Sequence, residues 1–160
     1  MLRSMTRLVI TLGLAGGLWA QTAQSTITVK MDNIGTFTIP GWSFGTTNAT
    51  VLSTAGGTSS RAQISALNLV KEFDDSSTKL FYASVAGTHV AKVELTQIDP
   101  SGKHPPMVIT LENVMVSSYQ LGGNTSAGAP GETISLTFIK ITIEYNHYKT
   151  YWDLSTNKGA

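Results

Sequence analysis

Two stretches of alternating apolar residues near the C-terminus constrain the fold of this chain more than any other feature. The first, Met107–Leu121, reads MVITLENVMVSSYQL, and the second, Glu132–His147, reads ETISLTFIKITIEYNH. Because successive side chains of a β-strand point to opposite faces, this alternation is typical of strands. The glycine-rich segment Gly122–Gly131 between them is typical of a turn. Together these segments predict a long β-hairpin.

Each stretch changes its apolar phase part-way. In the second, apolar side chains take even positions from Ile134 to Phe138 and odd positions from Ile139 to Tyr145. In the first, the phase changes after Asn113. A slip of one residue would turn every later side chain to the other face, whereas a β-bulge at Phe138–Ile139 restores the inward face and bends the strand. The pattern predicts strands bent around a barrel; the alternative is a strand buried on both faces in its second half, as at a subunit interface.

The composition indicates one domain rich in strands and turns. Charged residues make up 13% of the 160 residues, and the chain contains 15 glycines. Together with abundant β-branched residues and serine, this fits an all-β domain. No cysteine is present. The formal net charge of +1 is too small to predict binding to nucleic acid or to an anionic membrane.

The N-terminus has the organisation of a secretory signal peptide. Two arginines precede the apolar run Leu8–Leu18, and small residues follow at Ala20 and Ala23. The run is shorter than the about 20 residues that span a bilayer. We therefore predict a signal peptide over residues 1–23, cleaved after Ala20 or Ala23, and a domain over residues 24–160 that is secreted or periplasmic and not membrane-bound. The alternative is an uncleaved N-terminal anchor.

The remaining segments predict further strands and one long connection. Strands are indicated at Thr26–Met31, Thr36–Phe44 (interrupted by Pro40-Gly41), Arg61–Leu69, Thr88–Ile98 and Tyr148–Leu154. The small, polar segment Gly45–Ser60 is either a flexible loop or a β-hairpin arm with Gly56-Gly57 at its tip. Segments this long in compact domains are usually functional or disordered.

One helix is predicted at Asp74–Gly87. Ser76 or Ser77 can cap its N-terminus, and its final glycine is expected to end it. Its apolar face is expected to comprise Leu80, Phe81, Ser84 and Val85. This face should cover one open end or one side of the barrel.

Six segments, taken in order, carry a resemblance to a known family. They are Trp42–Gly45 (WSFG), Leu67–Phe73 (LNLVKEF), Ser77–Gly87 (STKLFYASVAG), Ile109–Tyr119 (ITLENVMVSSY), Glu132–Tyr145 (ETISLTFIKITIEY) and Trp152–Lys158 (WDLSTNK). In this order they resemble the Hcp family, the tube proteins of bacterial type VI secretion, which are related to phage tail tube proteins. The resemblance runs from Thr26 to the end of the chain.

The resemblance implies a fold and an assembly. The expected fold is all-β, a small β-barrel of two packed sheets with one short flanking α-helix. Six subunits would form a ring, rings would stack into a tube, and effector cargo or tube-tip proteins would be the partners. The family has no catalytic site. Its members normally lack a cleaved signal peptide, so the alternative is a secreted Hcp-like binding or adhesin module that does not build a secretion tube.

Candidate functional residues are those suited to a subunit interface. Trp42 and Trp152 are expected to be core or interface anchors, since aromatic residues are enriched at interface centres. Arg61, the only arginine after the predicted cleavage sites, is either an intersubunit partner or a solvated charge. The second apolar phase supplies the remaining candidates, Ile139, Ile141 and Ile143.

The sequence contains few motifs typical of a catalytic, metal or cofactor site. His89, His104 and His147 have no metal-ligand spacing, and no GxSxG elbow or phosphate-binding loop is present. We therefore predict no enzyme activity, metal or cofactor. A secreted hydrolase on a β-sandwich is a third hypothesis, with paired carboxylates drawn from Glu112, Glu132 and Glu144. These glutamates are more simply outward-facing or interface residues.

Overall fold

The computed structural model describes residues 25–48, 50–53, 56–59, 61–123 and 128–160, with backbone alone for 50–53 and 56–59. The predicted signal peptide and both of its cleavage positions lie outside the described residues. Within the described ranges, no helix is long and apolar enough to cross a membrane.

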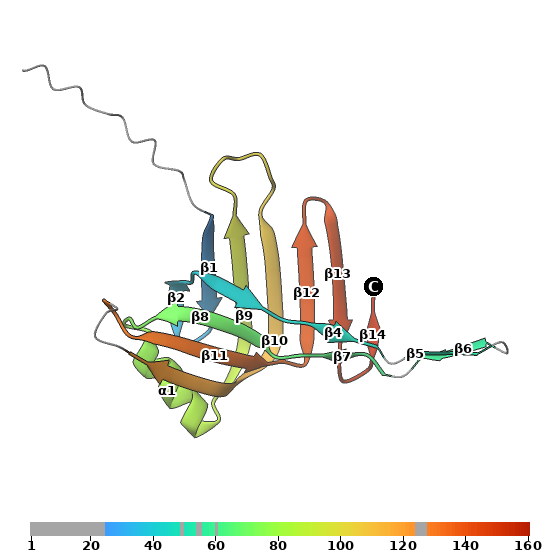
Figure 1. Ribbon diagram of the computed structural model, residues 1–160, viewed down its shortest axis with the longest axis horizontal. Coiled ribbons are helices and arrows are strands. Elements are labelled where there is room, and N and C mark those ends of the chain that lie inside the picture. The colour runs from blue at the N-terminus through green and yellow to red at the C-terminus, as the bar shows by residue number, and fades with distance from the viewer. Residues whose placement is uncertain (1–24, 49, 54–55, 60, 124–127) are drawn as a thin grey trace, which may run out of the picture.

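The described part of the chain is built from strands and one helix (Figure 1). In chain order the elements are β1 (Thr26–Met31), β2 (Gly35–Thr38), β3 (Gly41–Ser43), β4 (Thr46–Thr47), β5 (Thr50–Ser53), β6 (Gly56–Ser59), β7 (Gln63–Ile64), β8 (Leu67–Glu72), α1 (Ser77–Ala86), β9 (His89–Ile98), β10 (Met107–Gly122), β11 (Gly131–Thr137), β12 (Lys140–Tyr145), β13 (Tyr148–Asp153) and β14 (Lys158–Gly159). The mainly-β class with one short helix is confirmed.

Strand β10 organises the sheet because its two halves pair with different strands. Its N-terminal half lies between β9 and β12, with Ile109 opposite both Leu95 and Ile143. Its C-terminal half pairs with β11, down to Gly122 opposite Gly131. The result is two facing layers, β14-β13-β12-β10-β9-β1-β2 and β10-β11-β8-β3. The predicted hairpin is therefore confirmed.

The predicted phase changes are confirmed, but their geometry differs from a single bulge. In β10 the change falls at Asn113, whose φ of 56° is left-handed. In the second stretch the strand is interrupted between β11 and β12, because these two strands pair with different halves of β10. At this break the Ile139 amide donates to the Glu112 carbonyl oxygen at 3.1 Å. The expected bulge at Phe138–Ile139 is thus a strand break, and a register shift lies instead between Val116 and Ser118.

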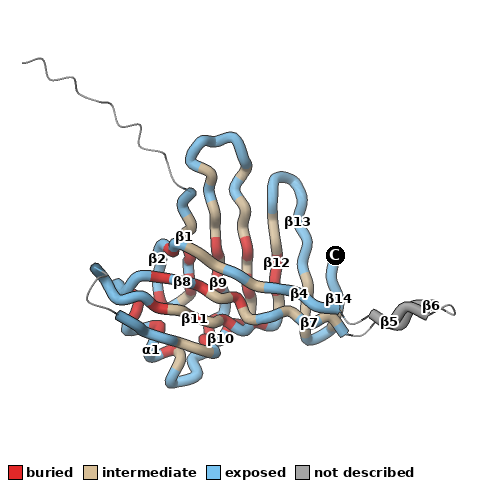
Figure 2. Tube along the Cα trace, in the orientation of Figure 1, coloured by how far each residue is buried: buried red, intermediate tan, exposed pale blue. Residues whose placement is uncertain are grey.

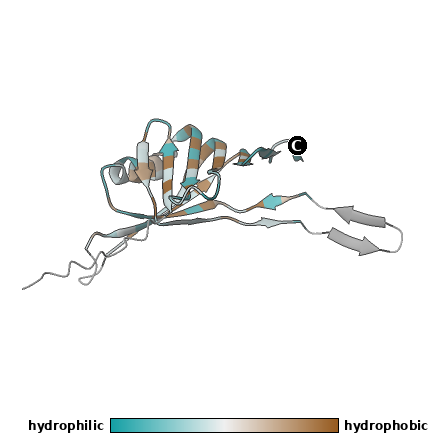
Figure 3. Ribbon diagram, turned by 90° about the horizontal axis from the view of Figure 1, so that it is seen from above, coloured by the Kyte–Doolittle hydropathy of each residue, from teal (hydrophilic) through white to brown (hydrophobic). Residues whose placement is uncertain are grey.

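The sheet is folded over but is not a closed barrel. Among the described strands, β2 pairs only with β1, β3 only with β8, and β14 only with β13. The prediction of a barrel is therefore wrong in this respect, although the two packed layers are present. Buried residues concentrate where the layers face each other (Figure 2). Apolar and polar residues alternate along the strands (Figure 3), as the period of two requires.

Helix α1 is shorter and turned differently from the prediction. It spans Ser77–Ala86 and ends at Gly87, which has the expected left-handed φ of 61° and donates its amide to the Ala83 carbonyl oxygen. Neither serine side chain caps it as predicted, because the Ser76 hydroxyl donates to the Asp74 carboxylate instead. The buried positions are Ser77, Leu80 and Ala83. The expected burial of Phe81 and Val85 is wrong, since the spacing i, i+3, i+6 faces the sheet.

The segment after β3 forms a hairpin arm, one of the two predicted alternatives. Strand β4 pairs with β7, and β5 pairs with β6 with Ser53 opposite Gly56. Gly56 and Gly57 therefore belong to the returning strand rather than to the tip of the arm. The ribbon of β4 and β7 leaves the body and β5 and β6 continue it (Figure 1).

Candidate functional site

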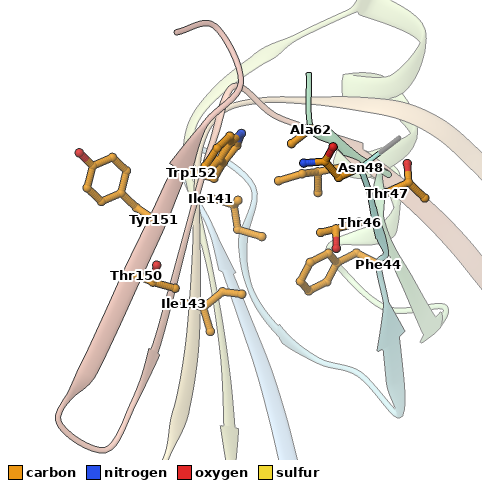
Figure 4. Close-up of a pocket in the computed structure, with 11 residues that line it drawn as sticks. Phe44, Thr46, Thr47, Asn48, Ala62, Ile141, Ile143, Thr150, Tyr151 and Trp152 are labelled. Carbon is orange, nitrogen blue, oxygen red and sulfur yellow. The ribbon is translucent and has the colours of Figure 1, made fainter. Parts of the chain in front are cut away.

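An open apolar cleft lies between the C-terminal strands and the β4–β7 ribbon (Figure 4). Its volume is about 350 Å³, which is within the range of protein binding sites. One wall consists of Ile141, Ile143 and Trp152 on β12 and β13, and the facing wall includes Phe44 and Ile64.

The cleft follows from the alternation of β12 and β13. Ile141 stands directly opposite Trp152 in the strand pairing, and Ile143 opposite Thr150. These four side chains share the inner face, whereas Tyr151 projects from the other face of β13 (Figure 4). Among the described residues, the wall that faces this part of the sheet consists of the two-residue strands β4 and β7 and the residues beside them. A short ribbon covers less area than a full strand layer, so the apolar surface stays partly open.

A turn after β13 holds the edge of the cleft in place. Arg61 donates through Nη2 to the Leu154 carbonyl oxygen and, at 3.3 Å, to that of Ser155. The Asp153 carboxylate accepts from the Ser155 hydroxyl at 2.6 Å and from the Thr156 amide at 3.1 Å. These bonds, the Ser155 hydroxyl first, hold the pKa of Asp153 below its usual value.

This depressed pKa predicts an acid-sensitive turn. The turn should contribute stability at pH values above the unfolded pKa of about 3.9 and lose it as the pH falls through the lower folded pKa. Carboxyl titration by NMR should give Asp153 a midpoint below about 3.9, and exchange of the Ser155 amide should accelerate as the pH passes that midpoint. In the Asp153→Asn variant this acceleration should vanish. A midpoint at or above the ordinary value would contradict the account.

Three of the six predicted interface residues line the cleft. Ile141, Ile143 and Trp152 line it, and Arg61 directly precedes the lining residue Ala62. Trp42 does not line it, but its ring lies 6.0 Å from that of the lining residue Phe44, and its indole donates to Gln97 Oε1 at 3.1 Å. Ile139 does not belong to it: this side chain is exposed at the strand break.

The residues of the facing wall, among them Phe44 and Ile64, were not candidates. Phe44 ends the predicted strand before the arm, and Ile64 alternates with polar neighbours in the strand after it. Both are apolar residues in predicted strands, but no local sequence pattern shows that their two segments face the same side of the sheet. Whether any of these residues contacts another subunit stays a prediction.

A second notable group is a buried ionic cluster under α1. Lys71 Nζ lies 2.7 Å from Glu132 Oε1, with the two side chains 1% and 0% exposed. Ser77 Oγ bonds both, at 3.0 Å from Lys71 and 2.5 Å from Glu132. Burial, together with the nearby Glu132 carboxylate, raises the pKa of Tyr119 to about 12. The cluster ties β8, β11 and α1 together and is closed to solvent, so its role is structural.

Within the described ranges no group of three or more His, Cys, Asp or Glu side chains is placed to hold a metal. Of the three candidate glutamates of a hydrolase, Glu132 is buried in the ionic cluster. Glu112 and Glu144 line one open pocket, where each forms a cross-strand ion pair, with Lys140 and Lys149 respectively.

Comparison with known proteins identifies the family of this chain. Residues 23–145 match the family model described as "Type VI secretion system effector, Hcp". The chain belongs to the Hcp family. The match runs from just before β1 to the end of β12, so it contains the whole β10 framework and most of the cleft. It confirms the resemblance and contains five of the six sequence segments, whereas Trp152–Lys158 lies beyond the matched residues.

Individual Hcp proteins agree with this placement. The protein hcp1 of Pseudomonas aeruginosa is 28% identical over 91 residues, which is 56% of this chain and 56% of that protein. A solved type six secretion system protein shares the fold with a TM-score of 0.77 at 24% identity, covering 86% of this chain and 100% of that one. Hcp1 from Salmonella typhimurium has a TM-score of 0.72 at 18% identity, covering 85% and 99%. The chain thus spans little more than half of the curated relative, but nearly all of the solved structures.

Proposed function

We propose that this chain is the subunit of a homohexameric ring that stacks into a type VI secretion tube and carries effector proteins. Membership of the Hcp family supports the proposal, as does the open apolar cleft that three of the predicted interface residues, Ile141, Ile143 and Trp152, line. Its role is architectural, with no catalytic site. The predicted signal peptide supports a secreted or periplasmic location.

A cleft of this kind suits assembly because apolar surface gains free energy when it leaves water. Its walls are apolar side chains held on paired strands, so little conformational entropy is lost when a second surface docks. A monomer would keep Phe44, Ile64 and Trp152 in partial contact with water, whereas a ring would bury them. The cleft is therefore the surface to alter in a test.

Native mass spectrometry of residues 24–160 at micromolar concentration is the direct test. The wild-type chain should appear as a hexamer. Thr47→Arg, which places a bulky charge in the cleft, should shift it to monomers, while the matched Thr38→Arg on β2 should leave the hexamer intact. A wild-type chain that stays monomeric would rule out the ring.

The second candidate is a secreted Hcp-like binding or adhesin module that does not build a tube. The signal peptide predicted from the sequence favours it, because tube proteins exported by a contractile machine have no need of one. Electron microscopy of the concentrated hexamer separates the two. Stacked tubes support the secretion tube, and isolated rings or single subunits support the module.

A further inference from the structure

The outer surface of α1 is unusually apolar. Phe81, Tyr82 and Val85 are 53%, 67% and 66% exposed, and Met115 is exposed close to the end of the helix. If an aromatic side chain carries roughly 200 Å², these four residues expose on the order of 400 Å² of largely apolar area. Patches of this size on a monomer are often functional. We call these four residues the helix patch.

The helix patch and the cleft lie at opposite ends of the body. Helix α1 lies beyond β8 and β11 at one end, whereas β4, β7 and β13 form the other (Figure 1). Neither surface can therefore cover the other within one subunit. A ring made by one repeated contact needs two different surfaces on each subunit, one for each neighbour. The chain presents two such surfaces.

The residues before α1 and the edge of the cleft carry opposite charges, whereas α1 itself carries Lys79 beside Tyr82. The chain enters α1 through the exposed carboxylates of Glu72 and Asp75. The edge of the cleft carries Arg61 and, opposite Asp153 in the β13–β14 pairing, Lys158. The Asp153 carboxylate is already occupied by its own turn. An acidic approach to the helix thus matches a basic edge of the cleft, which favours one orientation of docking.

We propose that the cleft of one subunit receives the helix patch of the next. This inference rests on the proposed ring and names the surfaces that build it. Phe81, Tyr82 and Val85 follow the spacing i, i+1, i+4, which presents them on one side of the helix, as in other helices that dock into apolar grooves. About 400 Å² is half of the roughly 800 Å² that each partner buries in a standard interface, so the helix patch forms the centre of the contact.

Variants altered on one surface only provide the test. Val85→Arg on the helix patch and Thr47→Arg in the cleft should each be monomeric by native mass spectrometry, with unchanged circular dichroism. Mixed in equal amounts, they should form a one-to-one heterodimer, because the mixture retains one intact cleft and one intact helix patch. The matched Ile98→Arg, at an exposed isoleucine on the end of β9 that lies away from α1, should remain a hexamer.

Crosslinking gives a second readout that does not require disrupting the fold. Because the chain has no cysteine, the double variant Tyr82→Cys with Thr47→Cys should form disulfides between subunits under mild oxidation, in ladders up to six. The pair Ile98→Cys with Thr47→Cys should not. A Val85→Arg variant that remains hexameric would overturn this inference but not the ring. The same holds if the wild type is hexameric but the mixed variants form no heterodimer and the double-cysteine variant forms no crosslinked ladder. A monomeric wild type would overturn the ring itself.

Discussion

Replacing Lys71 with methionine is expected to destabilise the fold by about 3–5 kcal/mol, the cost of leaving a buried charge without its partner. Glu132 is fully buried and lies 2.7 Å from Lys71 Nζ. Without the ammonium group its carboxylate would have to stay charged in an apolar site or take up a proton. Ser77 would also lose its bond to Lys71, which weakens the anchoring of α1 to the sheet. Urea unfolding followed by circular dichroism measures the loss.

The surface pair Lys140–Glu112 supplies the matched control. Its Nζ–Oε1 distance is 2.9 Å, similar to that of the buried pair, but both side chains are partly exposed. Lys140→Met should therefore cost no more than about 1 kcal/mol. Combining Lys71→Met with Glu132→Leu should recover much of the lost stability, since no buried unpaired charge then remains. Asp74, the other carboxylate that pairs with Lys71, is 44% exposed and stays solvated. Equal losses for the two single lysine variants would show that burial does not set the energy of this pair.

Replacing Leu80 with alanine is expected to cost about 2–5 kcal/mol. Leu80 is 0% exposed and lies on the face of α1 that packs against the sheet. Alanine removes buried apolar atoms and leaves a cavity that the surrounding strands can fill only in part. The loss should appear as a lower urea midpoint with an unchanged slope, because the surface exposed on unfolding hardly changes.

The same substitution at Leu121 separates burial from residue type. Leu121 is 54% exposed near the end of β10, so Leu121→Ala should stay within about 0.5 kcal/mol of the wild type. Val85→Ala should behave like Leu121→Ala in the unassembled subunit, because Val85 is also exposed. A cost at Val85 as large as that at Leu80 would mean that the helix is turned as the sequence pattern predicted.

Helix α1 illustrates why part of the fold could not be predicted from the sequence. Its position and its end at Gly87 depend on local chemistry, namely the left-handed conformation that glycine adopts at little cost. Its rotation about its own axis does not. Apolar residues occur on both sides, and only the position of β10 decides that Leu80 and Ala83 are buried while Phe81 and Val85 are not.

The candidate site divides in the same way. Alternation along one strand was enough to place Ile141 and Ile143 on a common face, and an aromatic residue such as Trp152 was a reasonable anchor beside them. The opposite wall comes from the β4–β7 ribbon, about ninety residues earlier in the chain. No local pattern encodes a contact over that separation, so Phe44 and Ile64 became recognisable only in three dimensions.

The sequence by itself determined the mainly-β class, the hairpin of β10 and β11, the phase changes at Asn113 and after Phe138, and membership of the Hcp family. These depend on side-chain periodicity and on the order of short segments, which are local properties of the chain. Tertiary structure alone decided that the sheet folds over without closing, that Lys71 and Glu132 meet under α1, and that an apolar cleft and the helix patch stay open at opposite ends. Each of these depends on contacts between residues distant in sequence, which close only when the two layers pack.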